Sequence, residues 1–246
     1  MNNIRSPFAN TPPVVKNLII INVLMLLATW VLQTRGINLE TTLGLHYIGS
    51  PAFKPYQLVT HLFMHGGFTH LLFNMFALWM FGRVLENVWG PKRFFIYYFA
   101  TGLGAAALHT FVNYLEFHAV ASKMTQENID LVMQQGVEIW RQGKNYTDPL
   151  MGQLNAILNV PTVGASGAVY GVLIGFGMLF PNTMLMLIFP PIPIKAKYAI
   201  GGMILIEVYL GFTNSGGNIA HFAHLGGALF GFLIIKYWNK NSKHFF

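Results

Sequence analysis

Residues 163–180 read VGASGAVYGVLIGFGMLF, an uncharged stretch in which Gly167, Gly171 and Gly175 recur every four residues. About 20 apolar residues in a helix cross the hydrocarbon core of a bilayer. Small residues at a spacing of four let two such helices approach closely. The stretch therefore predicts a membrane-spanning helix that packs tightly against a neighbour.

Further apolar runs lie on both sides of this stretch. The chain has 246 residues, of which 54% are hydrophobic and 9% charged, and this composition is too apolar for a soluble domain. No repeat divides it into similar halves. We therefore predict one all-α domain, a six-helix polytopic membrane bundle over residues 17–238. Besides 163–180, the runs are 18–32, 71–89, 94–115, 198–212 and 219–238.

The distribution of the formal net charge of +7 predicts the orientation of the bundle. Cytoplasmic loops of membrane proteins carry an excess of Lys and Arg. We therefore expect cytoplasmic termini, 1–16 and 239–246, and external loops over 34–67 and 116–162. The cations on the predicted cytoplasmic side are Arg5, Lys16, Lys92, Arg93, Lys195, Lys197, Lys236, Lys240 and Lys243.

This charge pattern and the absence of cysteine exclude several classes of protein. The basic residues follow the membrane topology and do not form one basic surface, so we expect no nucleic-acid partner. Zero cysteines exclude disulfides, thiolate metal sites and a cysteine nucleophile. Within the second loop, residues 122–141 mix apolar and charged positions, which predicts an amphipathic helix at the membrane interface or a simple spacer.

Polar residues gather at one predicted depth in the membrane. The second, fourth and sixth runs all pass from outside to inside, so their first turns share a level. These turns carry His70 and Asn74, Ser166, and His224. Polar groups in a membrane are costly and usually face the bundle interior or a wet cavity. The convergence favours a functional site over the alternative that Ser166 is only a small packing residue on a glycine stripe.

The residue types at this level fit acyl transfer. A serine nucleophile needs a base within hydrogen-bond reach, and His224 is the candidate because Gly227 and Gly231 place a second glycine stripe below it. No Asp or Glu lies near the heads of these three runs, which favours a Ser–His dyad over a triad with a carboxylate. Tyr170, one turn below Ser166, is expected to orient the imidazole by stacking.

An oxyanion needs hydrogen-bond donors, and His70 and Asn74 lie four residues apart on one helical face. With the Ser166 backbone N–H they are expected to form the oxyanion site. His61 and His65 would also allow a zinc site or a proton relay, but no Glu follows in the H-E-x-x-H pattern. We expect structural roles for these two histidines and for His221, and neither a metal nor a cofactor.

The order of these motifs resembles that of the rhomboid intramembrane serine proteases of the bacterial six-span type. Residues 164–167 (GASG) resemble the nucleophile motif of that family, 223–227 (AHLGG) its general-base motif, and His70-x-x-x-Asn74 its oxyanion segment. The resemblance covers residues 15–238. It also implies a bacterial inner membrane as the location, and supporting roles for Gly164, Gly167, Tyr170 and Glu86.

The resemblance implies a serine endopeptidase that cleaves single-span membrane proteins near the external face of the bilayer. An alternative is a non-proteolytic rhomboid-like protein that binds transmembrane helices. A small transporter would show repeats and broken helices. The oligomeric state is not predicted.

Other features of the sequence lead to smaller expectations. Tyr56-Gln57 stands where many rhomboids carry Trp-Arg, so loop anchoring is expected to differ. Substrates are expected to pass the fifth run, with 211–218 as a mobile loop over the site. Glu86 is expected to tie its helix to a neighbour, with Arg83 as a partner. For Glu207, inside the fifth run, the sequence suggests no specific role.

Overall fold

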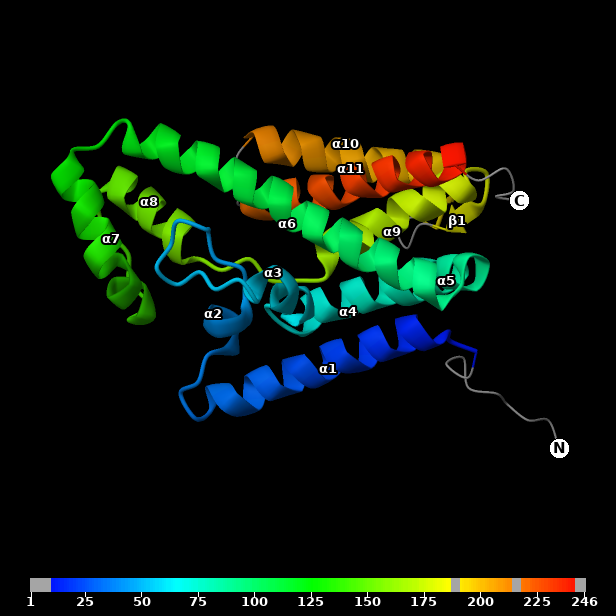
Figure 1. Ribbon diagram of the computed structural model, residues 1–246, viewed down its shortest axis with the longest axis horizontal. Coiled ribbons are helices and arrows are strands. Elements are labelled where there is room, and N and C mark those ends of the chain that lie inside the picture. The colour runs from blue at the N-terminus through cyan, green and yellow to red at the C-terminus, as the bar shows by residue number, and fades with distance from the viewer. Residues whose placement is uncertain (1–9, 187–190, 214–217, 242–246) are drawn as a thin grey trace.

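The computed structural model describes residues 10–186, 191–213 and 218–241, which are predominantly helical (Figure 1). This confirms the predicted all-α class. In chain order the elements are α1 Pro13–Gln33, α2 Leu39–Leu43, α3 Gln57–Thr60, the 3₁₀ helix η1 His61–Phe63, α4 Phe68–Ala77, the π turn η2 Leu78–Gly82, α5 Arg83–Trp89, α6 Pro91–Ala121, α7 Gln126–Arg141, α8 Pro149–Asn159, α9 Ser166–Leu179, β1 Met184–Met186, β2 Pro193–Lys195, α10 Ala196–Thr213 and α11 Asn218–Asn241. The two strands pair antiparallel between α9 and α10.

Each predicted apolar run corresponds to a helical unit. Within the described residues, four units are long and apolar enough to cross a membrane: α1, the continuous helix Phe68–Trp89 formed by α4, η2 and α5, α6, and α10. The other two are α9, a shorter apolar helix of 14 residues, and α11, with 24 residues. Helix α6 continues to Ala121, six residues beyond the end of the predicted apolar run at 115.

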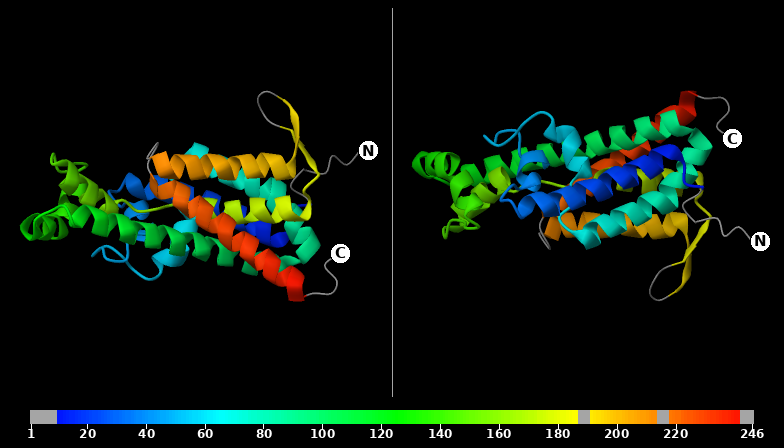
Figure 2. Two further views of the ribbon diagram at one scale, coloured as in Figure 1. Left: turned by 90° about the horizontal axis from the view of Figure 1, so that it is seen from above. Right: turned by 90° about the horizontal axis from the view of Figure 1, so that it is seen from below.

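Helix α9 lies in the middle of the bundle (Figures 1 and 2) and packs against α4, α5, α6, α10 and α11. Its contact with α11 is backbone to backbone. A Cβ added to Gly231 would lie 3.1 Å from the Gly171 Cα, and one added to Gly227 would overlap the Gly167 carbonyl oxygen. The two predicted glycine stripes therefore meet here. Gly175 instead faces Leu85, where a Cβ would come within 3.0 Å of Cδ1.

One end of the bundle carries a helical hairpin, seen beyond the C-terminal end of α6 in Figure 1. The predicted helix over 122–141 is present as α7, and the sequence did not predict its partner α8. Val132 is buried in a small apolar cluster with Leu154 and Leu158 of α8. The apolar face of α7 is therefore covered at least partly by α8.

Glu86 of α5 fixes the start of α1. Its buried carboxylate accepts hydrogen bonds from the backbone N–H groups of Val14 at 2.9 Å and Val15 at 2.8 Å. The first N–H groups of a helix lack partners inside the helix, and a negative charge there complements the helix dipole. The expected tie between helices is thus present, whereas Arg83 lies over the Trp79 ring at 4.5 Å.

Replacing Glu86 by alanine is expected to destabilise the fold by about 1–3 kcal/mol, because a buried and a partly buried N–H group lose their acceptor. Thermal unfolding in detergent micelles measures the change. Glu138→Ala is the control, because Glu138 is exposed on α7 and forms an exposed ion pair with Arg141 at 3.8 Å. Equal unfolding midpoints for the two variants would contradict this role of Glu86.

Candidate active site

Ser166 is the first residue of α9, and the turn before it is shaped by Gly164. Gly164 has φ of +129°, a conformation that favours glycine. A Cβ at Gly164 would lie 2.8 Å from Cε1 of His70, so a side chain there would collide with the ring. The Gly164 N–H donates to the His61 carbonyl oxygen at 3.0 Å. The loop before α9 is thus joined to η1 and passes close to α4.

The structure brings Ser166 and His224 into hydrogen-bond contact. The distance from Ser166 Oγ to His224 Nε2 is 2.9 Å, across the α9–α11 interface that the glycines allow. The rings of Tyr170 and His224 stack with centroids 4.3 Å apart and planes 8° from parallel. This is the arrangement that the sequence led us to expect for Tyr170. The imidazole is therefore fixed both at one nitrogen and on one face.

His70 and Asn74 of α4 line the same cavity as Ser166 and His224. This cavity has a volume of about 310 Å³ and is also bordered by Met203 of α10. One N–H of the Asn74 side-chain amide donates to the His70 carbonyl oxygen at 2.9 Å, and an amide nitrogen has a second N–H to offer. All four residues predicted from the three helix heads are therefore gathered around one space.

A smaller cavity of about 120 Å³ also borders the pair. Ser166, His224 and His70 line it together with Leu45, His61 and residues of α6. The Ser166–His224 pair therefore borders two cavities, one lined by α4 and α10 and one lined by α6, Leu45 and His61.

His61 in η1 and His65 just after it are buried rather than directed at a common ligand site. His61 Nδ1 is 2.8 Å from the Gln57 carbonyl oxygen, and the His65 ring meets the His70 ring edge-on at 5.0 Å. Burial lowers the pKa of His61 to about 4 and that of His65 to about 4, and for His65 the neighbouring His70 adds to the effect. Both rings are therefore neutral at physiological pH.

Acidification is expected to destabilise the protein. The ordinary pKa of histidine is 6.5, so the unfolded chain takes up protons below that pH, whereas folded His61 and His65 stay neutral to about pH 4. The stability contributed by these neutral rings is thus complete above pH 6.5 and is lost as the pH falls toward 4. Unfolding midpoints measured between pH 4 and pH 7 give the slope of stability against pH.

His61→Asn is expected to reduce that pH slope, because an asparagine amide N–H replaces Nδ1–H without titrating. His118→Gln, on the exposed part of α6, is expected to keep the wild-type slope. If the pH dependence of stability is the same in His61→Asn as in wild type, the buried neutral His61 ring is not a source of that dependence.

Glu207 of α10 is the residue that sequence reasoning missed. Its carboxylate is 3.1 Å from Nδ1 of His224 and 2.6 Å from Nδ1 of His221, and it accepts a hydrogen bond from the Tyr170 hydroxyl. The prediction of a dyad considered acids only at the heads of the second, fourth and sixth runs, and this one comes from the fifth. The signal available in the sequence was an acidic residue inside an apolar run, since such a charge is costly in a membrane and usually functional.

Glu207, His221 and His224 are also the one group of three potential metal ligands among the described residues, with donor atoms within 4.8 Å of one another. The carboxylate is shared between the two imidazoles and the Tyr170 hydroxyl. The three side chains therefore form one polar cluster centred on the Glu207 carboxylate.

The fold and this geometry define a polytopic helical membrane protein with a partly buried serine–histidine pair. The chain belongs to the rhomboid family, because the family model of the Rhomboid domain matches residues 52–240.

Relatives of the chain come from bacteria and mitochondria. It is 28% identical over 181 residues to "Putative rhomboid protease YdcA" of Bacillus subtilis, covering 73% of this chain and 65% of that protein. It is 28% identical over 184 residues to "Rhomboid protein 1, mitochondrial" of Saccharomyces cerevisiae, covering 75% and 42%. It is also 28% identical over 208 residues to the human "Presenilin-associated rhomboid-like protein, mitochondrial", covering 82% and 44%. The chain thus matches less than two thirds of the length of these relatives.

Proposed function

We propose that this protein is an intramembrane serine endopeptidase in which Ser166 is the nucleophile and His224 the general base. The observation that carries the proposal is the 2.9 Å contact between Ser166 Oγ and His224 Nε2 inside a bundle of apolar helices. Membership of the rhomboid family supports it. The proposal favours proteolysis over binding of transmembrane helices without cleavage.

In the proposed reaction, His224 Nε2 takes the hydroxyl proton of Ser166 as Oγ attacks a peptide carbonyl carbon. The oxyanion receives hydrogen bonds from the Ser166 N–H, the His70 ring and the second amide N–H of Asn74. The Ser166 N–H suits this role because the first N–H of a helix has no acceptor within the helix. His224 then protonates the leaving amine, and water hydrolyses the acyl-enzyme.

The proposed substrates are single-span membrane proteins, reaching the site from the bilayer through the 310 Å³ cavity. Phe73 of α4 is 60% exposed beside this cavity, and Leu205 of α10 is 71% exposed. A helical substrate hides its peptide bonds, so cleavage requires local unwinding near small or helix-breaking residues. Of the expected covering loop 211–218, residues 214–217 lie outside the described residues.

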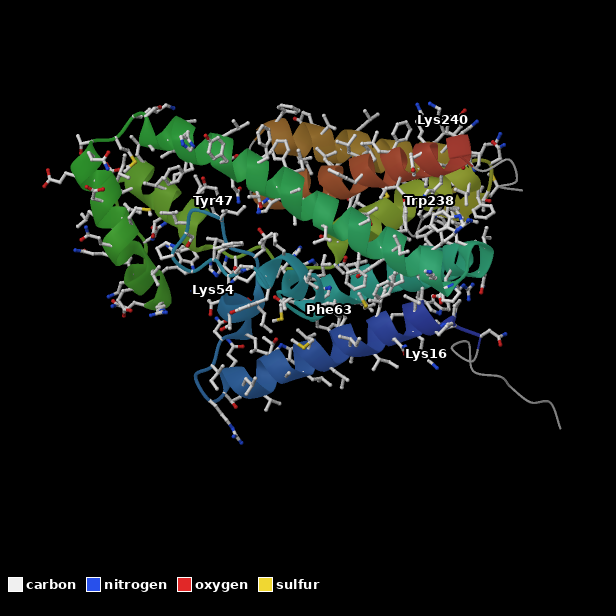
Figure 3. All side chains as sticks on the ribbon, in the orientation of Figure 1. Lys16, Tyr47, Lys54, Phe63, Trp238 and Lys240 are labelled. Carbon is white, nitrogen blue, oxygen red and sulfur yellow. The ribbon has the colours of Figure 1, made fainter. Side chains whose placement is uncertain are left out.

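The proposed orientation places both termini in the cytoplasm, in a bacterial inner membrane. Lys16 of α1 and Lys240 of α11 lie at the same end of the bundle, and Lys54 of the outer loop lies toward the other (Figure 3). An excess of Lys and Arg on the cytoplasmic side supports this orientation.

The experiment that tests the function uses purified protein reconstituted into liposomes with single-span reporters that carry small residues and a helix breaker in their outer third. Mass spectrometry of the products locates the cut. We expect cleavage within that outer third. Reporters that remain bound but intact with folded wild-type protein would favour the non-proteolytic alternative.

A further inference from the structure

We propose that Glu207 is a positioning residue for the reaction, a carboxylate from α10 that orients His224 and stabilises its protonated form. The inference rests on the proposed function and adds a residue that the Ser–His mechanism does not use. It makes the site a Ser166–His224–Glu207 arrangement in which the acid comes from the fifth membrane helix.

The argument begins with the two nitrogens of His224. Nε2 must be free to accept the serine proton, so the neutral ring must carry its own proton on Nδ1. Glu207 Oε1 lies 3.1 Å from that Nδ1. A carboxylate there favours the tautomer that the reaction needs. In this structure the Nδ1–H of His224 and the Glu207 oxygen do not meet the geometry of a hydrogen bond. Catalytic hydrogen bonds often align only when substrate binds.

The carboxylate is itself held in place. The Tyr170 hydroxyl donates to Oε1, and His221 Nδ1 lies 2.6 Å from Oε2. Tyr170 therefore contacts both His224 and Glu207, because its ring stacks on the imidazole while its hydroxyl donates to the carboxylate. Only 8% of Glu207 is exposed. This degree of fixation is what a positioning residue requires.

The charge of Glu207 matters most when His224 becomes positive. The groups facing His224 are Ser166 and Tyr170 from α9, His70 from α4, His221 from α11 and Glu207, and of these Glu207 is the one carboxylate. A buried anion is costly until a cation forms beside it. Proton transfer from Ser166 creates that cation, so the attraction is stronger in the transition state than in the resting enzyme.

A different role for the same contacts would be a latch that keeps α10 closed. Helix α10 is peripheral, with Tyr209 67% and Phe212 77% exposed, and Glu207 joins it to α9 and α11. A latch controls access of substrate and would change mainly KM. A positioning residue acts on the chemical step and changes kcat.

The test compares reporter cleavage by wild type, Glu207→Gln and Glu207→Asp in liposomes. Glu207→Gln keeps the shape and removes the charge, and we expect kcat to fall by about 10- to 1,000-fold with KM within about twofold. Glu207→Asp retains the charge and is expected to recover part of kcat. Tyr209→Phe, on the lipid-exposed side of the same helix, is the matched control with wild-type kinetics.

A second measurement separates chemistry from folding. A serine-directed phosphonate is expected to modify Ser166 in Glu207→Gln to the full extent but more slowly than in wild type. A wild-type kcat and labelling rate in Glu207→Gln would overturn the inference, and so would a change confined to KM. If the folded wild type neither cleaves nor labels at Ser166, the proposed function fails instead.

Discussion

Ser166→Ala and His224→Ala are each expected to lower kcat/KM for a transmembrane reporter by at least about 10⁴-fold. The reason is that Oγ and Nε2, 2.9 Å apart, act as one unit, so removing either leaves only binding and oxyanion stabilisation. The double variant is expected to be no worse than the single ones, because the two residues share one step. Rates from gel or mass-spectrometric assays in liposomes measure these effects.

The control for these variants is Ser122→Ala, which changes an exposed serine at the end of α6 and is expected to cleave at the wild-type rate. Thermal unfolding in micelles verifies that each variant is folded. Substantial cleavage by folded Ser166→Ala would rule out this serine as the nucleophile.

Gly227→Ala is expected to produce the largest structural effect, a loss of folded protein or a destabilisation of about 3 kcal/mol or more. A Cβ at this position would overlap the carbonyl oxygen of Gly167, and backbone atoms have no rotamer by which to move away. Helices α9 and α11 would have to separate, which would also part Ser166 from His224. Thermal unfolding and cleavage rates both report the change.

The matched control is Gly201→Ala in α10, where an added Cβ meets no atom within 4 Å. Alanine is a better helix former than glycine by about 1 kcal/mol, so this variant is expected to be at least as stable as wild type. If Gly227→Ala has the same unfolding midpoint as Gly201→Ala, the close contact between α9 and α11 is not present in solution.

The helices of the bundle were predictable because a bilayer permits few backbone conformations in a spanning segment. A spanning segment must satisfy its own backbone, so long apolar runs indicate helices. The meeting of Ser166 with His224 was predictable in part, because glycine stripes below both residues mark surfaces where two backbones can touch.

Other parts of the structure leave little trace in a single sequence. Helix α8 is held by long-range packing in the apolar cluster that contains Leu154 and Val132, and hydrophobic periodicity does not specify such partners. The contact of Glu207 with His224 depends on how α10 packs against α9 and α11. A lone acid in an apolar run identifies a costly charge but not its partner.

The most direct test of the central claim is covalent labelling of folded, detergent-solubilised wild-type protein with a serine-directed fluorophosphonate, followed by mass spectrometry of the modified peptide. The account predicts an adduct on Ser166 that forms in wild type and is strongly reduced in His224→Ala. A folded wild type with no adduct at Ser166, or with an adduct whose rate is unchanged by His224→Ala, would contradict the account.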